Sequence, residues 1–196
     1  YALPSECILA LSNYKIEDNT KDVLYSVSAS RDILYLDMTQ FYYDLFAGQS
    51  TAVNNRSQLW DHLQDGTDRI LLKKYSQPTS SSNTGMEVLA TRKQVVPLIR
   101  LSEIYLIAIE SAPTLDEANA FYIPYMKARN VNASPLREEQ LMAEVIREYR
   151  REFFGEGQMF YTYKRLGTKN MLWKTDREVG EQDYIMPLPS TELNIN

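Results

Sequence analysis

Two glutamates, Glu152 and Glu156, lie four residues apart in the segment RREFFGEGQMFYTYKRLG, residues 150–167. Paired carboxylates can hydrolyse glycosidic bonds, but only when they face each other across a substrate. Gly155 ends the helix between these two. Three nearby cations are Arg147, Arg150 and Arg151. Because cations lower carboxyl pKa values, the setting suits ion pairs better than a general acid, and we expect no catalytic residue here.

The sequence contains few cysteine or histidine residues that could bind a metal or a cofactor. Cys7 is the only cysteine and His62 the only histidine, which excludes an intramolecular disulfide, a cysteine-based zinc site and a histidine-rich metal site. The GEG stretch lacks the Lys-Ser/Thr of a phosphate-binding loop. We therefore expect no metal and no cofactor. A net charge of −5 argues against a general nucleic-acid binder.

Apolar residues dominate VVPLIRLSEIYLIAIESA, residues 95–112, which predicts a helix buried on most faces with Pro97 near its start. Glu103 and Glu110 lie seven residues apart on one stripe of that helix, and Arg100 lies one turn before Glu103. Buried carboxylates are costly unless paired, so we expect these glutamates to meet cations or backbone donors.

Two further helices follow. Thr114 and Glu117 form a capping-box pattern that predicts a helix running toward Arg129, kinked or ended by Pro124. Ser134-Pro135 predicts the start of the next helix. The apolar stripe of that helix is Leu141, Val145, Tyr149 and Phe153. A last helical piece, residues 156–166, should end at Gly167.

The first half of the chain has weaker patterns. CILAL, residues 7–11, predicts a strand, residues 17–19 a turn and residues 37–46 a helix. SQPTSSSNTGM, residues 76–86, predicts a loop without packing capacity. We expect residues 1–90 to be loop-rich and residues 91–196 to be helical, in a mainly α fold whose helix spacing resembles helix-pair repeats.

Several segments in order resemble the SusD/RagB family. They are SECILAL (5–11), NNRSQLW (54–60), LLKKY (71–75), IRLSEIYLIAIESA (99–112), REFFGEGQMFYTYKRLG (151–167) and YIMPLPSTELNIN (184–196). The tail matches the usual end of a family member, whereas the start corresponds to the middle of one. The chain therefore resembles the C-terminal part of a larger protein.

The resemblance implies a mainly helical, tetratricopeptide-like scaffold with long irregular loops. It also implies a non-catalytic lipoprotein on the surface of the outer membrane of Bacteroidetes, held there only by a lipid anchor on the missing N-terminal part. Such a protein binds an oligosaccharide, a polysaccharide or another nutrient and passes it to a SusC-like TonB-dependent transporter.

Two sets of residues then acquire expected roles. The scaffold set, whose charges should hold the helices in register, is Arg100, Glu103, Glu110, Arg147, Glu152, Glu156 and Arg165. The candidate ligand-binding set on the loops is Tyr35, Tyr42, Tyr43, Arg56, Trp60 and Tyr75. For Trp60, packing with Leu59 and Leu63 on the helical core is the alternative to stacking on a sugar.

Two alternative functions stay open. The first is a glycoside hydrolase that uses acids outside the scaffold set, such as Asp37, Asp44 and Asp61. Turnover of a glycan would distinguish it from a binding protein. The second is a helical-repeat interaction module without a small ligand, which would bind the transporter and no glycan.

Overall fold

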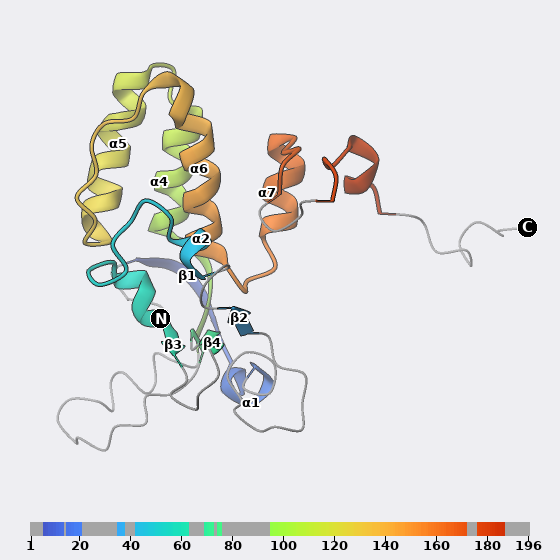
Figure 1. Ribbon diagram of the computed structural model, residues 1–196. Helices are drawn as coiled ribbons and strands as arrows, with labels where there is room; N and C mark the ends of the chain where they lie inside the picture. The colour runs from blue at the N-terminus through green and yellow to red at the C-terminus, as the bar shows by residue number, and fades with distance from the viewer. Residues whose placement is uncertain are drawn as a thin grey trace, which may run out of the picture. The chain divides into compact units, whose positions relative to one another are not determined.

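A computed structural model describes residues 6–13, 15–20, 35–37, 42–62, 69–72, 74–75, 95–171 and 176–186. These belong to two compact units, Tyr1–Glu152 and Phe153–Asn196. Helices outweigh strands in the described ranges, which confirms a mainly α fold (Figure 1). The expected division of the chain near residue 90 stays a prediction.

Strand β1 (Cys7–Ser12) pairs antiparallel with β5 (Val95–Arg100), with Cys7 opposite Arg100. The predicted strand at residues 7–11 is therefore confirmed. The predicted helix over residues 95–112 is wrong in its first six residues, because these form β5. Val95 and Val96 favour extended backbone, and Pro97 is tolerated in a two-stranded sheet because both strands are edges.

Helix α4 (Leu101–Ser111) begins where β5 ends. Leu106 and Ile109 are buried on it, but Ile104 and Ile107 are exposed. The prediction of a helix buried on most faces is therefore wrong: α4 packs one face against α5 and leaves an apolar stripe on the surface of the described structure. Glu103 and Glu110 are half-buried.

Helix α5 (Leu115–Ala128) has the predicted cap, since the Thr114 side chain accepts a hydrogen bond of 3.2 Å from the Glu117 N–H. It does not end at Pro124. A proline inside a helix costs about 3 kcal/mol, and burial of the neighbouring Tyr122, Tyr125 and Met126 offsets that cost.

Helix α6 (Glu138–Phe153) begins later than Ser134-Pro135 predicts. The side chain of Asn119 on α5 accepts from the Leu136 N–H at 2.7 Å and donates to the Leu136 carbonyl at 2.9 Å. These two bonds engage the Leu136 backbone before the helix begins. The predicted stripe is confirmed at Val145, Tyr149 and Phe153, which are all buried, whereas Leu141 at its start is half-buried.

Three short strands form an antiparallel sheet in the order β2-β4-β3. They are β2 (Tyr35–Asp37), β3 (Trp60–His62) and β4 (Arg69–Leu72). The central strand β4 buries Ile70, Leu71 and Leu72, so the middle of this sheet is apolar and shielded from solvent.

Short helices lie between these strands and before them: α1 (Ile16–Thr20), α2 (Tyr43–Leu45) and the 3-10 helix η3 (Asn55–Leu59). The turn predicted at residues 17–19 is wrong, because those residues lie in α1. The helix predicted at 37–46 is wrong at Asp37, which ends β2, and is confirmed at Tyr43–Leu45. Residues 38–41 lie outside the described residues. The loop predicted at 76–86 lies outside the described residues.

In the second unit, Gly155 and Gly157 adopt positive φ values after α6, and α7 (Met159–Leu166) follows. Gly167 ends α7 in the left-handed conformation at φ 57°, as predicted. The 3-10 helix η4 (Glu181–Tyr184) contacts α7, and its Tyr184 hydroxyl donates to the Thr168 carbonyl.

Candidate functional site

Helix α6 presents two carboxylates, Glu148 and Glu152, on its buried face. Their side chains are 1% and 7% exposed. Residues four apart lie one above the other on a helix, so both point into the interior of the first unit. Ionised carboxylates in such a place need cations and hydrogen-bond donors.

Glu148 meets two arginines. Its carboxylate oxygens lie 2.6 Å from Arg56 Nη1 and 2.5 Å from Arg151 Nη1, and the Gln49 side chain donates a further hydrogen bond. Burial by itself would raise the pKa of Glu148, but Arg56 and Arg151 outweigh it and hold that pKa below its ordinary value.

Glu152 lies among more cations at longer range. Its carboxylate is 3.4 Å from Arg129 Nε, 3.6 Å from Arg100 Nη1 and 3.7 Å from Arg56 Nη1. Lys74 Nζ donates to its backbone carbonyl at 2.9 Å. Burial opposes ionisation, yet these four cations lower the pKa of Glu152 to about 2. Glu152 is therefore ionised at neutral pH and cannot donate a proton as a general acid there.

Arg56 is positioned by the start of η3. Asn54 is fully buried and caps this helix, its side-chain oxygen accepting from the Arg56 backbone N–H at 3.0 Å and from Arg56 Nε at 3.3 Å. Burial lowers the pKa of Arg56, but Glu148, Tyr125 and Glu152 outweigh it, so the pKa rises above its ordinary value. The guanidinium is held both in place and in its charged form.

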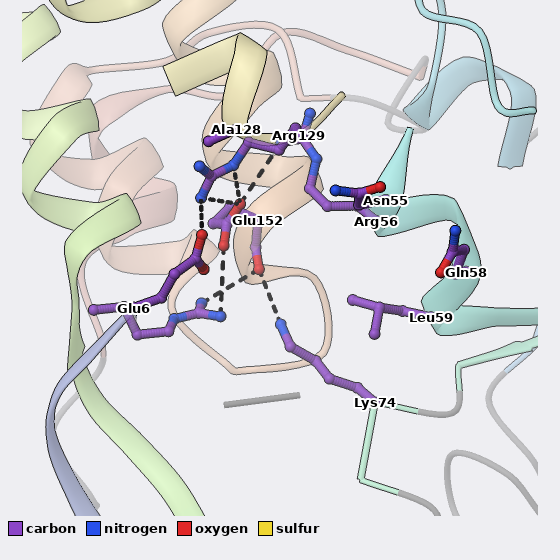
Figure 2. Close-up of a pocket in the computed structure, with 10 residues that line it drawn as sticks. Glu6, Asn55, Arg56, Gln58, Leu59, Lys74, Ala128, Arg129 and Glu152 are labelled. Carbon is purple, nitrogen blue, oxygen red and sulfur yellow. Dashed lines mark hydrogen bonds and ion pairs between the residues drawn. The ribbon is translucent and has the colours of Figure 1, made fainter. Parts of the chain in front are cut away.

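A cavity of about 250 Å³ lies beside Glu152. Its lining residues come from η3, the end of β5, the end of α5 and the residue after it, and α6. Glu6 lies just before β1 and Lys74 just after β4. They are Glu6, Asn55, Arg56, Gln58, Leu59, Lys74, Arg100, Ala128, Arg129 and Glu152. Figure 2 shows Glu152 at the centre, with Arg129 on one side and Lys74 on the other.

The predicted scaffold residues fall in different places. Arg100 and Glu152 meet at the cavity. Arg147 is exposed and pairs with Glu144 at 2.9 Å on the surface of α6. Glu156 is half-buried and Arg165 exposed, both in the second unit.

Sequence reasoning missed Glu148, Lys74 and Glu6, whereas Arg151 was among the cations expected to form ion pairs here. The spacing of Glu148 and Glu152, with Arg151 between them, was a readable signal for a buried ion-pair face on α6. Lys74 and Glu6 carry no comparable local signal, because their partners are distant in the sequence. Arg56, expected on a ligand-binding loop, lies in the ion-pair cluster.

The aromatic candidates do not gather on one described surface. Tyr42 and Trp60 are buried and pack edge to face at 6.2 Å. Tyr75 is half-buried, and the side chain of Tyr35 lies outside the described residues. Tyr43 is 50% exposed. Which residues bind a ligand stays a prediction.

Of the acids in the hydrolase alternative, Asp44 is exposed and Asp61 half-buried. The side chain of Asp37 lies outside the described residues. Among the described ranges there is no group of three or more His, Cys, Asp or Glu residues placed to hold a metal ion. No helix in the same ranges is both long and apolar enough to span a membrane.

Fold and site together define a mainly helical protein whose buried charged side chains form ion pairs within its scaffold. A model of the SusD family matches residues 49–189, well over half of the chain. The chain therefore belongs to the SusD family, as its resemblance implied. This is a family of non-catalytic nutrient-binding proteins associated with glycan uptake. The curated proteins and the solved structures yield no match to the chain.

Proposed function

We propose that this protein is a non-catalytic, glycan- or nutrient-binding component of a Sus-like uptake system. In this proposal it is a lipoprotein at the surface of a Bacteroidetes outer membrane, built on a tetratricopeptide-like scaffold, and passes its ligand to a SusC-like TonB-dependent transporter. The observation that carries the proposal is the match of residues 49–189 to the SusD family.

The chemistry of the buried cluster supports binding over catalysis. Several cations hold each of its carboxylates, Glu148 and Glu152, in the ionised form. Permanently ionised carboxylates can hold helices together through ion pairs, but they cannot donate a proton as a general acid. Arg56 and Arg129 join η3 and the end of α5 to α6 through the same carboxylates. A rigid scaffold of this kind can present loops for ligand binding.

Among the candidate aromatics we propose Tyr43 as a stacking residue for a sugar ring. Its ring is exposed, and it packs edge to face at 5.6 Å on the buried Tyr42 ring. A flat apolar ring face with a hydroxyl at its tip suits the C–H face and hydroxyl groups of a sugar. Support from Tyr42 reduces the entropy lost when Tyr43 engages a ligand.

A glycan panel tests the function. Each polysaccharide would be titrated into the protein by isothermal calorimetry, and the same mixtures would be analysed by chromatography for shortened products. We expect saturable binding of at least one glycan and intact polymer in every mixture. Released oligosaccharides would contradict the proposal and favour the hydrolase.

Binding to the transporter provides a second test of the proposed function. Co-purification with a SusC-like transporter, made with the protein in its native membrane, should recover both components. Recovery of the transporter with no binding to any glycan would favour the interaction module instead.

A further inference from the structure

The cavity beside Glu152 is lined by more positive than negative side chains among the described residues. Its cations are Arg56, Lys74, Arg100 and Arg129, and its carboxylates are Glu6 and Glu152. None of the four cations is more than 7% exposed. Buried side chains of one sign concentrated around a hollow create a strong local potential, because little water screens them.

Within the cavity, the arginine contacts to the Glu152 carboxylate are long. Arg129, Arg100 and Arg56 approach its carboxylate at 3.4–3.7 Å, whereas charge-assisted N–H···O bonds are about 2.7–2.9 Å long. Arg56 shows the difference in a single side chain, since the same Nη1 atom lies 2.6 Å from Glu148. The Glu152 carboxylate is thus shared among three guanidinium groups, and each of these distances exceeds that of a short charge-assisted hydrogen bond.

Glu6 is the more accessible of the two lining carboxylates. Its side chain is 28% exposed, against 7% for Glu152, and it lies 3.6 Å from Arg129 Nη2. A carboxylate at this distance and exposure is weakly held, because solvent screens it and its geometry is loose. It occupies the place at Arg129 that another anion could take.

We propose that this cavity binds a small oxyanion group, a carboxylate or an inorganic oxyanion such as sulfate, which displaces Glu6 from Arg129. Arg129, released from Glu6, supplies the principal charged donor. A volume of about 250 Å³ lies below the ~300–1,000 Å³ of pockets for drug-sized ligands, so the ligand is small. This site is separate from the proposed Tyr43 stacking surface and does not depend on it.

Two sources of the oxyanion can be distinguished by calorimetry at constant ionic strength. The probes are sodium sulfate, sodium glucuronate and neutral glucose, each titrated against a chloride background. Glucuronate and glucose share a pyranose ring and differ in the carboxylate. We expect saturable heat with sulfate, with glucuronate or with both, and none with glucose. Binding of glucuronate alone identifies a sugar acid as the ligand, whereas binding of sulfate alone identifies an inorganic anion.

The decisive variant is Glu6→Gln, chosen because it should strengthen binding and so cannot mimic a folding defect. Removing the competing charge should lower the Kd for the anion by about threefold or more, consistent with the worth of a partly exposed ion pair. Lys127→Gln is the control: it changes a charge in the last turn of α5, two residues before Arg129, at an exposed position outside the cavity lining.

The proposal is overturned by an absence of saturable anion binding, by equal binding of glucose and glucuronate, or by an unchanged Kd in Glu6→Gln. It is also overturned if Lys127→Gln weakens binding as much as Glu6→Gln strengthens it, since that result would indicate a general surface-charge effect. A lower Kd in Glu6→Gln with an unaltered Lys127→Gln control supports it.

Discussion

Arg56 Nη1 and a carboxylate oxygen of Glu148 lie 2.6 Å apart, although the two residues are separated by 92 positions in the chain. Both side chains are almost wholly shielded from solvent. The pair therefore joins η3 to α6. Removing either partner should strongly destabilise the fold, because the other charge would then stay buried without a counter-charge.

Replacing Glu148 with alanine should lower the free energy of unfolding by about 3–5 kcal/mol, because Arg56 and Arg151 would be left without their closest anion. Urea unfolding followed by circular dichroism measures the change. Glu139→Ala is the matched control on the same helix, since the exposed Glu139–Arg137 pair should contribute less than about 1 kcal/mol. Equal effects of the two substitutions would contradict a buried cluster.

Acid should destabilise the protein through Glu152. Its pKa is about 2 in the folded state against an ordinary value of 4.5, so the ionised form is preferred by the fold. The resulting stabilisation, about 3 kcal/mol at 1.36 kcal/mol per pKa unit, is fully present above pH 4.5 and is lost as the pH falls toward 2. Urea unfolding at a series of pH values from 7 to 3 would measure it.

The Glu152→Gln variant is the control for this pH dependence. It cannot titrate at position 152, so its stability should fall less steeply between pH 4.5 and 3 than that of the parent. Parallel curves for the two proteins would show that other carboxylates account for the acid sensitivity.

Trp60→Ala should cost about 3–5 kcal/mol of stability, since Trp60 is 6% exposed and packs against the Tyr42 ring. Tyr43→Ala, at a 50% exposed neighbour of Tyr42, should change stability by only about 0.5 kcal/mol. Chemical denaturation compares the two. A Trp60→Ala protein of unchanged stability would return Trp60 to the candidates for sugar stacking.

Tyr43→Ala has its own functional expectation. If Tyr43 stacks on a sugar, its removal should weaken glycan binding about five- to thirtyfold, as loss of an aromatic contact of about 1–2 kcal/mol implies. Calorimetry with the best glycan from the panel measures this. Tyr43→Phe keeps the ring and should retain most of the affinity; equal binding by all three proteins would exclude Tyr43 from the site.

Gly167→Ala should destabilise the second unit by about 1–2 kcal/mol, because a Cβ is strained in the left-handed conformation at φ 57°. A Cβ at this position would meet no atom within 4 Å, so backbone strain is the whole expected effect. Gly167→Asn should cost less, since asparagine tolerates this conformation. Thermal melting followed by circular dichroism would separate the two variants.

Local signals in the sequence predicted several elements correctly. Gly167 ends α7, the Thr114 side chain caps α5, and the stripe through Val145 and Tyr149 faces the interior. Each depends on interactions within a few residues or on the 3.6-residue period of a helix. The ordered SusD-like segments were equally readable, and they predicted the family correctly.

Tertiary contacts decided the remainder. Residues 95–100 are apolar enough for a helix, but pairing with β1 makes them a strand. Asn119 delays the start of α6 by binding the Leu136 backbone. Arg56 looks like a loop cation in the sequence and is a buried partner of Glu148 in the fold. Strand pairing and ion pairing join residues tens of positions apart, and local propensity, which differs by only about 1 kcal/mol per residue, is too weak to determine them.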